Sequence, residues 1–398
     1  MEFSTLGELS ISGKGSYGIA ASAVPCSKEL YTYLRITDIT DDGRINSSGL
    51  MSVDNVNAEK YLLQPNDIVF ARTGGSTGRN YFYDGHDGEF VYAGFLIKFS
   101  INPQKVNPKF IKYYCQSKDY KEWVSSYNTG STRGNINAQT YAGMTVPMLP
   151  RKQQDGIVSV LESIDAKIEE NDHINENLEL QAQALYSAWF ESYVPFGGKM
   201  PADWNTGFLA DVAKISTKSF NPAKNPGIKL EHYSIPAFDE KKFPVFETSD
   251  DIKSNKYILS SISVLASKLN PDTKRIWRPM CLTDNAVCST EFIVFESANT
   301  EWKDFVYSII NSNNFSNWMC AHTTGSTNSR QRTTPAKTLE FEIVIPPENV
   351  IMDFCSTITP MYDLIAENRK ENHRLEKLRD TLLPKLMSGE LDVSNIEV

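Results

Sequence analysis

Two stretches of the sequence, 157–189 and 354–386, repeat one ladder of apolar residues that recur at steps of mostly four and three. The second ladder lies 197 positions after the first, and only Arg379 interrupts its apolar character. The rungs of the first ladder are Ile157, Leu161, Ile164, Ile168, Leu178, Ala182, Leu185 and Trp189. An apolar period of about 3.5 residues held over this length predicts two long helices that supercoil along a narrow seam.

Asparagine fills the two gaps of each ladder, at Asn171 and Asn175 in the first and Asn368 and Asn372 in the second. An amide in an apolar seam lowers stability but fixes the register, because a misaligned pairing leaves it without a hydrogen-bond partner. Two helices of one chain that each need a partner pair most simply with each other. We therefore predict an antiparallel coiled coil in which these four asparagines pair the helices near the middle. Pro384 predicts fraying or a kink near the end of the second helix.

The segments before each long helix are predicted to contain strands, then short helices, then a loop that begins Thr-Gly-Ser-Thr. Apolar or alternating runs bounded by turn residues predict strands at 33–40, 67–72, 89–100, 256–270 and 291–297. Short helices are expected at 107–126 and 301–318. The predicted fold class is α+β, with two repeated domains separated by the two long helices. The expected segments are domain 1 at 1–150, helix 1 at 151–194, domain 2 at 195–346 and helix 2 at 347–398.

Taken alone, the net charge of −9 argues against a nucleic-acid partner, but the excess of acidic residues is concentrated in the helical segments. Residues 151–198 carry −6 and residues 347–398 carry −4, whereas residues 1–150 are neutral and residues 199–346 carry +1. A near-neutral domain can still present a basic face to DNA. No apolar run is long enough for a membrane helix, and the six cysteines form no C-x-x-C pair, so we expect a cytoplasmic chain without a metal site.

Four loops combine the side chains that read DNA with the small residues that let a backbone approach phosphates. Arginine and lysine bind phosphates and guanine, and asparagine and glutamine bind adenine. A single such loop is more often a solvated turn, but two in each repeat favour DNA contact. The candidate DNA-binding residues in the first half are Arg72, Thr73, Ser76, Thr77, Arg79, Asn80, Asn128, Ser131, Thr132, Arg133 and Asn135. Those in the second half are Lys268, Asn270, Lys274, Arg275, Ser326, Thr327, Asn328, Arg330, Gln331 and Arg332.

Over nearly its full length the chain resembles the specificity subunit of a type I restriction-modification system. The stretches that carry the resemblance are YLRITDI (33–39), NDIVFARTGGSTGR (66–79), SKLNPDTKRIW (267–277), VIPPENV (344–350), LRDTLLPKLMSGEL (378–391) and the paired TGST loops. The resemblance implies a non-catalytic subunit in which the two repeated domains are target-recognition domains. Such a subunit reads a bipartite double-stranded DNA target and directs adenine methylation or cleavage by its partners. The resemblance also implies two methyltransferase subunits that use S-adenosylmethionine, and two restriction and translocase subunits that use ATP and Mg²⁺. No cofactor is expected in this chain.

Two alternatives from other functional classes remain open from the sequence. Asp272, Glu301 and Lys303 have the residue types of a Mg²⁺-dependent nuclease core, although such fragments arise often by chance. A coiled-coil scaffold that never touches DNA would also explain the two ladders. The glycine-rich GKGSYG at 13–18 fits a dinucleotide fingerprint, but Pro25 leaves little room for the helix that such a site needs.

Overall fold

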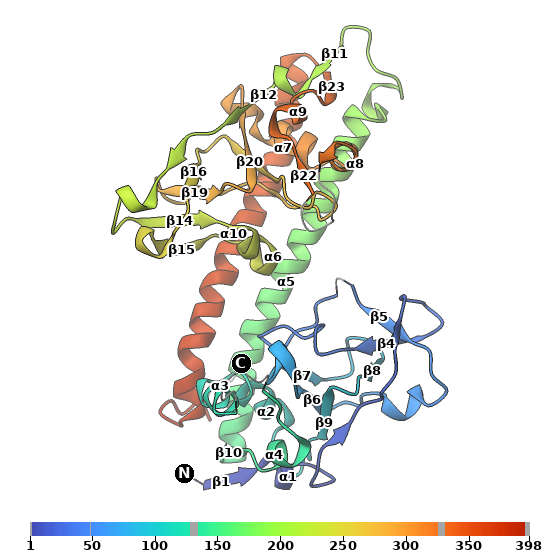
Figure 1. The fold of residues 1–398 in the computed structure, drawn as a ribbon, viewed down its shortest axis with the longest axis vertical. Coiled ribbons are helices and arrows are strands. Elements are labelled where there is room, and N and C mark those ends of the chain that lie inside the picture. The colour runs from blue at the N-terminus through green and yellow to red at the C-terminus, as the bar shows by residue number, and fades with distance from the viewer. Residues whose placement is uncertain (1, 48, 128–133, 325–330, 395–398) are drawn as a thin grey trace. The chain divides into compact units, whose positions relative to one another are not determined.

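The computed structural model of the chain describes residues 2–394 except 48, 128–133 and 325–330. Two compact units make up the chain: unit 1 comprises Met1–Ala166 and Leu375–Val398, and unit 2 comprises Lys167–Arg374. The helices α5 (Arg151–Phe190) and α10 (Glu348–Met387) contribute to both units (Figure 1). Each has 40 residues, and at about 1.5 Å per residue each is about 60 Å long.

Both ends of α10 lie 197 positions after the corresponding ends of α5, the same offset as between the two apolar ladders. Pro150 and Pro347 lie just before the helices. At this position the backbone N–H has no partner within the helix, so its absence in proline costs no hydrogen bond. The second helix ends at Met387, and Gly389 shortly beyond its end has a φ of +75°, as is common just after a helix. The helix continues past Pro384 and ends three residues later at Met387.

The four asparagines of the ladders lie together in unit 2, where α5 and α10 run antiparallel. Asn171 Nδ2 donates to Asn372 Oδ1 over 2.8 Å, and Asn368 Nδ2 donates to Asn175 Oδ1 over 3.0 Å. As the residue number rises by four along one helix it falls by four along the other, which is an antiparallel register. All four side chains are buried, and Asn171 also donates to Glu371. A shift in register would therefore leave buried amides without partners.

Single and combined replacements in this asparagine cluster are expected to act in opposite directions. Asn171→Leu strands the amide of Asn372 beside an apolar side chain and should lower stability by about 1–3 kcal/mol. Replacing all four asparagines by leucine removes every such amide and should raise the melting temperature, because apolar seams are more stable than polar ones. Thermal unfolding of the two variants beside wild type measures both effects. A quadruple variant that melts below the single variant would contradict this interpretation of the seam.

Unit 1 contains two four-stranded sheets and a two-stranded one, with strand orders β2-β9-β6-β7, β3-β5-β4-β8 and β1-β10. Its strands are β1 (Glu2–Thr5), β2 (Ser16–Tyr17), β3 (Ala23–Val24), β4 (Tyr31–Leu34), β5 (Met51–Val53), β6 (Asp67–Ala71), β7 (Asn80–Tyr83), β8 (Phe90–Tyr92), β9 (Leu96–Ser100) and β10 (Thr145–Met148). Its short helices are α1 (Leu6–Leu9), η1 (Ala58–Tyr61), η2 (Gly74–Ser76), α2 (Pro108–Tyr114), α3 (Lys118–Ser125) and α4 (Ala138–Ala142).

Unit 2 has the four-stranded order β12-β20-β17-β18, the five-stranded order β13-β16-β19-β14-β15 and the pairs β11-β23 and β21-β22. Its strands are β11 (Asn205–Phe208), β12 (Ala213–Ser216), β13 (Ser219–Phe220), β14 (Lys229–Tyr233), β15 (Val245–Thr248), β16 (Lys256–Ile258), β17 (Ser263–Ser267), β18 (Ile276–Trp277), β19 (Ala286–Ser289), β20 (Phe292–Ser297), β21 (Thr323–Thr324), β22 (Arg332–Thr333) and β23 (Glu342–Ile345). Its short helices are η3 (Val194–Phe196), η4 (Leu209–Asp211), η5 (Pro222–Lys224), α6 (Ile235–Lys241), η6 (Ser249–Asp251), η7 (Thr300–Trp302), α7 (Lys303–Ile310), α8 (Asn313–Ala321) and α9 (Pro335–Thr338).

The two units share one plan around matching cores. In each, the first strand pairs with the strand just before a long helix (β1 with β10, β11 with β23), and one sheet contains a single parallel pair among the described strands. In β6, Ile68 and Phe70 face the core that holds α2 and the start of α5, whereas Val69 faces the second sheet. Alternate residues of a strand point to opposite faces, so a strand covered on both sides is apolar throughout. The fold class expected from the sequence is confirmed.

Several predicted elements are shorter in the structure than their apolar runs. The strand expected at 33–40 ends at Leu34, because the Asp38 carboxylate accepts a hydrogen bond from the Arg35 N–H and closes a turn. The helices expected at 107–126 and 301–318 are each divided by a polar turn, at Ser117 and at Ser312, whose hydroxyls cap the next helix. Local capping bonds therefore decided the ends of these elements.

Candidate nucleic-acid interface

In unit 1 the loop after β6 is bridged to a second predicted DNA-binding segment. Thr73 pairs with Asn135 in an isolated β-bridge, and Ile136 N donates to the carbonyl of Arg72 over 2.9 Å. The Thr77 hydroxyl donates to the carbonyls of Gly74 and Gly134. The predicted residues Asn128, Ser131, Thr132 and Arg133 lie outside the described residues. The structure thus brings Arg72, Thr73, Thr77 and Asn135 together.

Glycine is required in this loop at Gly78. Its φ is +90°, and a side-chain Cβ there would lie 2.4 Å from Val124 of α3. The glycine therefore lets the loop return over the helix to begin β7. This close approach makes the loop part of the packed domain.

Arg72 is held between two partly exposed aromatic rings. Its Cζ lies 5.2 Å from the Tyr17 ring centroid and 5.9 Å from that of Phe95. Tyr17 is 44% exposed and Phe95 is 55% exposed, and the Tyr17 hydroxyl accepts a hydrogen bond from Ala138 N. Among the described residues no carboxylate pairs with Arg72, and its Nε is buried without a hydrogen-bond partner. Cation–π contacts position the Arg72 guanidinium without using its N–H groups, so these groups can donate hydrogen bonds to an acceptor on a bound partner.

The neighbouring predicted residues Arg79, Asn80 and Ser76 are buried or bonded within the domain. Arg79 Nε donates to Asp41 over 2.6 Å, and its Nη1 donates to the Ile39 carbonyl. Asn80 is 6% exposed and its Nδ2 donates to the Cys115 carbonyl, and Ser76 is buried as well. In this structure the Asn80 amide holds β7 to the end of α2. A buried donor that is already bonded to a carbonyl has no free face for a base edge.

Unit 2 repeats the bridged loops near the positions expected from the 197-residue offset. Leu269 pairs with Arg332 in an isolated β-bridge, and Thr333 N donates to the Lys268 carbonyl over 3.0 Å. Asn270 N donates to the Gln331 carbonyl, and Asn270 has a φ of +48°. The structure therefore joins the predicted residues Lys268, Asn270, Gln331 and Arg332. The predicted residues Ser326, Thr327, Asn328 and Arg330 lie outside the described part of the chain.

Three basic residues of this half are already paired inside unit 2. Arg275 binds Asp239 through two hydrogen bonds of 2.6 and 2.9 Å. Arg332 binds Glu291 over 3.1 and 3.4 Å. Lys274 points away from the loop, and its Nζ donates to the Asn311 carbonyl over 2.5 Å. An exposed ion pair such as Arg332–Glu291 is weak, so the arginine can exchange the carboxylate for a DNA phosphate. Lys274 instead faces a cavity of the domain.

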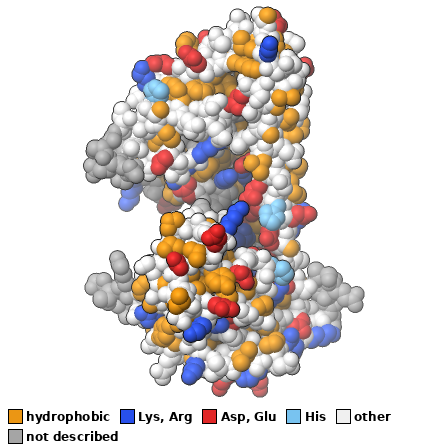
Figure 2. Space-filling model, turned by 90° about the vertical axis from the view of Figure 1, so that its right-hand side faces the viewer, with side chains coloured by type: hydrophobic (Ala, Val, Ile, Leu, Met, Phe, Trp, Pro, Cys, Tyr) orange, Lys and Arg blue, Asp and Glu red, His pale blue; other side chains and the backbone are white. Residues whose placement is uncertain are grey.

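Sequence reasoning missed Tyr17 and Phe95, which position Arg72. Tyr17 belongs to the glycine-rich stretch 13–18, which opens no helix: it contains β2, and β3 follows. The available sequence signal was an aromatic residue next to a glycine in both places, Tyr17 before Gly18 and Phe95 after Gly94. On the face drawn in Figure 2, described Lys and Arg side chains are scattered among Asp and Glu and form no continuous basic stripe. The candidate interface is therefore identified by the bridged loops and the position of Arg72, and the distribution of charge on this face does not identify it.

The nuclease alternative finds no support in the arrangement of its residues. Among the described residues, no three His, Cys, Asp or Glu side chains are grouped so that they could hold a metal ion. Asp272 is exposed in a turn, and Lys303 is half-buried with its Nζ bonded to the Pro279 carbonyl. Burial lowers the pKa of Lys303 to about 8. No helix in the described part of the chain is long and apolar enough to cross a membrane.

The fold is a duplicated α+β domain that is followed each time by a long pairing helix. Residues 1–180 match the family model described as the type I restriction modification DNA specificity domain. The match covers the first repeat and most of α5, and the chain as a whole is similar to the specificity subunits of type I restriction-modification systems.

Relatives of this family cover most of the chain. It is 25% identical over 324 residues to the type I restriction enzyme MjaIX specificity subunit of Methanocaldococcus jannaschii, covering 72% of this chain and 70% of that protein. It is 19% identical over 405 residues to the HindI specificity subunit of Haemophilus influenzae, covering 83% and 88%. The fold is similar to the crystal structure of the type I S subunit from M. genitalium, with a TM-score of 0.56 at 16% identity over 97% of this chain and 95% of that one.

Proposed function

We propose that this chain reads a bipartite double-stranded DNA target, one half-site for each repeat, and performs no chemistry itself. The observation that carries the proposal is the repeated pair of bridged loops, Arg72–Thr73 with Asn135–Ile136 and Lys268–Asn270 with Gln331–Thr333. A DNA duplex is approximately two-fold symmetric, so a single chain that reads two half-sites needs the same reading surface twice. The side chains differ between the repeats, which favours two unlike half-sites.

Methylation and cleavage would be supplied by partner subunits, as the similarity to specificity subunits suggests. These would be two methyltransferase subunits that use S-adenosylmethionine and two restriction subunits that use ATP and Mg²⁺. One methylated adenine is expected in each half-site, on opposite strands. The chain itself needs no cofactor in this proposal.

The test compares the chain alone with the chain produced together with its methyltransferase subunit. The chain alone, with DNA and Mg²⁺, should bind with an affinity that falls as salt rises, and should neither cut nor methylate. Cells that contain both subunits should show methylated adenine in two short sequences at a fixed distance. Cutting by the purified chain would support the nuclease instead, and salt-independent DNA binding, or none, would support the scaffold.

Arg72→Ala is expected to relax the sequence requirement in one half-site only. If Arg72 reads a base, its loss should weaken binding to the target duplex by about 1–3 kcal/mol, with reduced discrimination at one position. Methylome mapping and binding titrations measure this, and Lys118→Ala, which removes an exposed charge of the same unit, is the matched control. An even loss over all sequences, with a salt slope lower by about one, would make Arg72 a phosphate contact. Unchanged binding would remove Arg72 from the interface.

A further inference from the structure

The bridged loops and the turn beside them present three side-chain positions that correspond one to one between the repeats. Position A is Arg72 in unit 1 and Lys268 in unit 2, position B is Phe95 and Glu291, and position C is Asn135 and Arg332. The N–H of position A donates to the carbonyl of position B over 3.1 Å in unit 1 and 3.0 Å in unit 2. Position C bridges to the residue after position A, and the residue after position C donates to the carbonyl of position A. The two repeats therefore place different side chains on the same backbone frame.

The side chain at position B contacts a different arginine in each repeat. In unit 1 the centroid of the Phe95 ring lies 5.9 Å from Cζ of Arg72, at position A. In unit 2 the Glu291 carboxylate accepts hydrogen bonds from Nε and Nη2 of Arg332, at position C, over 3.1 and 3.4 Å. A ring attracts a guanidinium to its face, and a carboxylate binds it along one edge. Position B is therefore the contact through which each repeat holds an arginine.

Both arginines retain N–H groups that a DNA base could accept. The ring contact uses no N–H of Arg72, and the two bonds to Glu291 leave Nη1 of Arg332 without a partner among the described residues. Arg72 is partly exposed, and the Arg332 side chain is 46% exposed. Arginine reads guanine through two parallel hydrogen bonds to O6 and N7, so the orientation of its planar group decides whether both can form.

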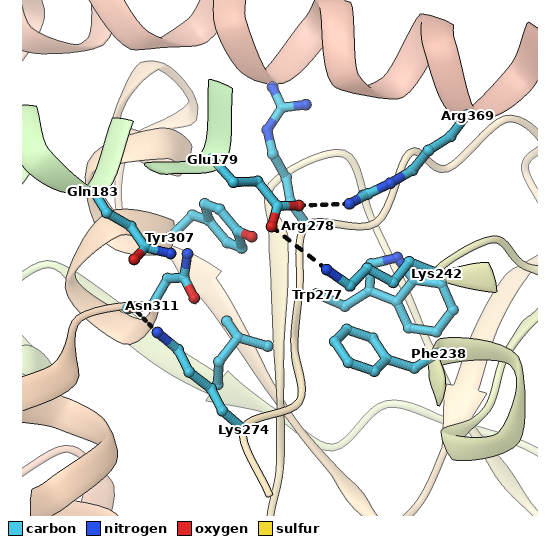
Figure 3. A pocket seen from close by; sticks show the side chains of 11 residues that line it. Glu179, Gln183, Phe238, Lys242, Lys274, Trp277, Arg278, Tyr307, Asn311 and Arg369 are labelled. Carbon is cyan, nitrogen blue, oxygen red and sulfur yellow. Dashed lines mark hydrogen bonds and ion pairs between the residues drawn. The ribbon is translucent and has the colours of Figure 1, made fainter. Parts of the chain in front are cut away.

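Other cations of unit 2 have partners outside the bridged loops. Figure 3 shows Arg369 at the Glu179 carboxylate and Lys274 at a backbone carbonyl. Lys268, at position A, makes no ion pair and no contact with an aromatic ring within the described residues. In the bridged loops of unit 2 the side chain that a neighbour holds is therefore that of Arg332.

We propose that position B determines specificity in each repeat by selecting the arginine that reads a guanine. Phe95 holds Arg72 for this purpose in one half-site, and Glu291 holds Arg332 in the other. Phe95 and Glu291 are positioning residues that act through their arginines. This assignment rests on the proposed DNA-reading function, and it names the chemistry by which each half-site is read.

The test measures base preference in two ways. Methylated adenine is mapped in cells that produce each variant with the methyltransferase subunit, and the purified chain is titrated against duplexes that carry the wild-type target with single base changes. Phe95→Leu removes the ring and should lower discrimination at one base of one half-site about fivefold. Glu291→Gln removes the charge that holds Arg332 and should lower discrimination at one base of the other half-site about tenfold. Phe95→Tyr keeps the ring and should keep the preference.

A positioning residue and its arginine should not have additive effects. Phe95→Leu should relax the same base as Arg72→Ala, and should have no further effect when it is combined with Arg72→Ala. Glu291→Gln and Arg332→Ala should behave in the same way in the other half-site. A residue that only stabilises the domain would instead weaken binding to every duplex by the same factor.

Matched controls remove the same groups elsewhere. Phe3→Leu removes a ring that is 62% exposed in β1, and Glu340→Gln removes an exposed carboxylate that is paired with Lys337. Both controls should keep the base preference of wild type.

Three results would overturn the proposal. The first is that Phe95→Leu and Glu291→Gln leave base preference unchanged, and the second is that they relax bases other than those of their arginines. The third is tighter binding of Glu291→Gln to every duplex alike, which would show that Glu291 only repels the DNA backbone and that Arg332 contacts a phosphate. A wild-type chain that gives no bipartite methylated sequence would overturn the proposed function itself, so the two failures are distinguishable.

Discussion

Inserting seven residues into both long helices is expected to lengthen the spacer between the two methylated half-sites by about three base pairs. The insertions belong after Ala166 in α5 and after Glu376 in α10, which lie opposite each other in the register set by Asn171 and Asn372. Seven residues add about 10 Å of helix, and DNA advances about 3.4 Å per base pair. Because the reading loops are untouched, both half-site sequences should stay the same.

One heptad is chosen because it keeps the apolar seam in phase. A four-residue insertion adds about 6 Å, equivalent to one or two base pairs, but it introduces a stutter that locally unwinds the pair. Three extra base pairs also rotate the duplex by about 100°, so the seven-residue variant should methylate less efficiently than the parent. Methylome mapping of both variants beside the parent gives spacer and efficiency together.

Two results would contradict this interpretation of the helices. A spacer that stays constant while methylation persists in both variants would show that the helices do not set the half-site distance. A single continuous recognition sequence in the parent would exclude the bipartite target itself. An insertion into α5 alone is the matched control, because either the asparagine pairs or the apolar rungs on the other side of the insertion must then lie out of register, which should reduce methylation without giving a new spacer.

Arg278→Met is expected to lower the stability of unit 2 by about 3–5 kcal/mol, because it leaves a buried carboxylate without its cation. Arg278 binds Asp304 over 2.5 and 3.1 Å, and the Asp304 side chain is 4% exposed. Thr359 of α10 also donates to Asp304 over 2.7 Å, so this carboxylate ties α7 to the long helix. For a unit of this size the loss corresponds to about 6–20 °C in melting temperature.

Arg275→Met is the matched control for this prediction. Arg275 also makes two hydrogen bonds to one carboxylate, that of Asp239, but the Asp239 side chain is 45% exposed. Water can solvate Asp239 after the arginine is removed, so the loss should stay below about 1 kcal/mol. The double variant Arg278→Met with Asp304→Asn should recover part of the stability, because the neutral amide tolerates burial. Equal losses in the two single variants would show that burial does not decide the strength of these pairs.

Much of the fold was predictable because its signals are local and repeated. The apolar ladder and its asparagines predicted α5, α10 and their antiparallel pairing, since side chains at 3.5-residue spacing share one helix face. Strand β6 was predicted almost to the residue, because a strand covered on both faces is a continuous apolar run. The strand at 33–40 was overestimated, because the turn bond from Asp38 is not visible in apolar periodicity.

The sequence by itself determined the repeat, the coiled seam and the set of loops in which DNA-binding side chains could lie. Only the tertiary structure decided which arginines of those loops have partners. Arg79 meets Asp41 from 38 positions away, Arg275 meets Asp239 from 36 and Arg332 meets Glu291 from 41. Arg72 instead meets two aromatic rings, and Lys274 is directed into a cavity. Periodicity fixes neighbours within an element, whereas ion pairs between loops depend on how whole strands and helices pack, so composition alone could not separate these side chains.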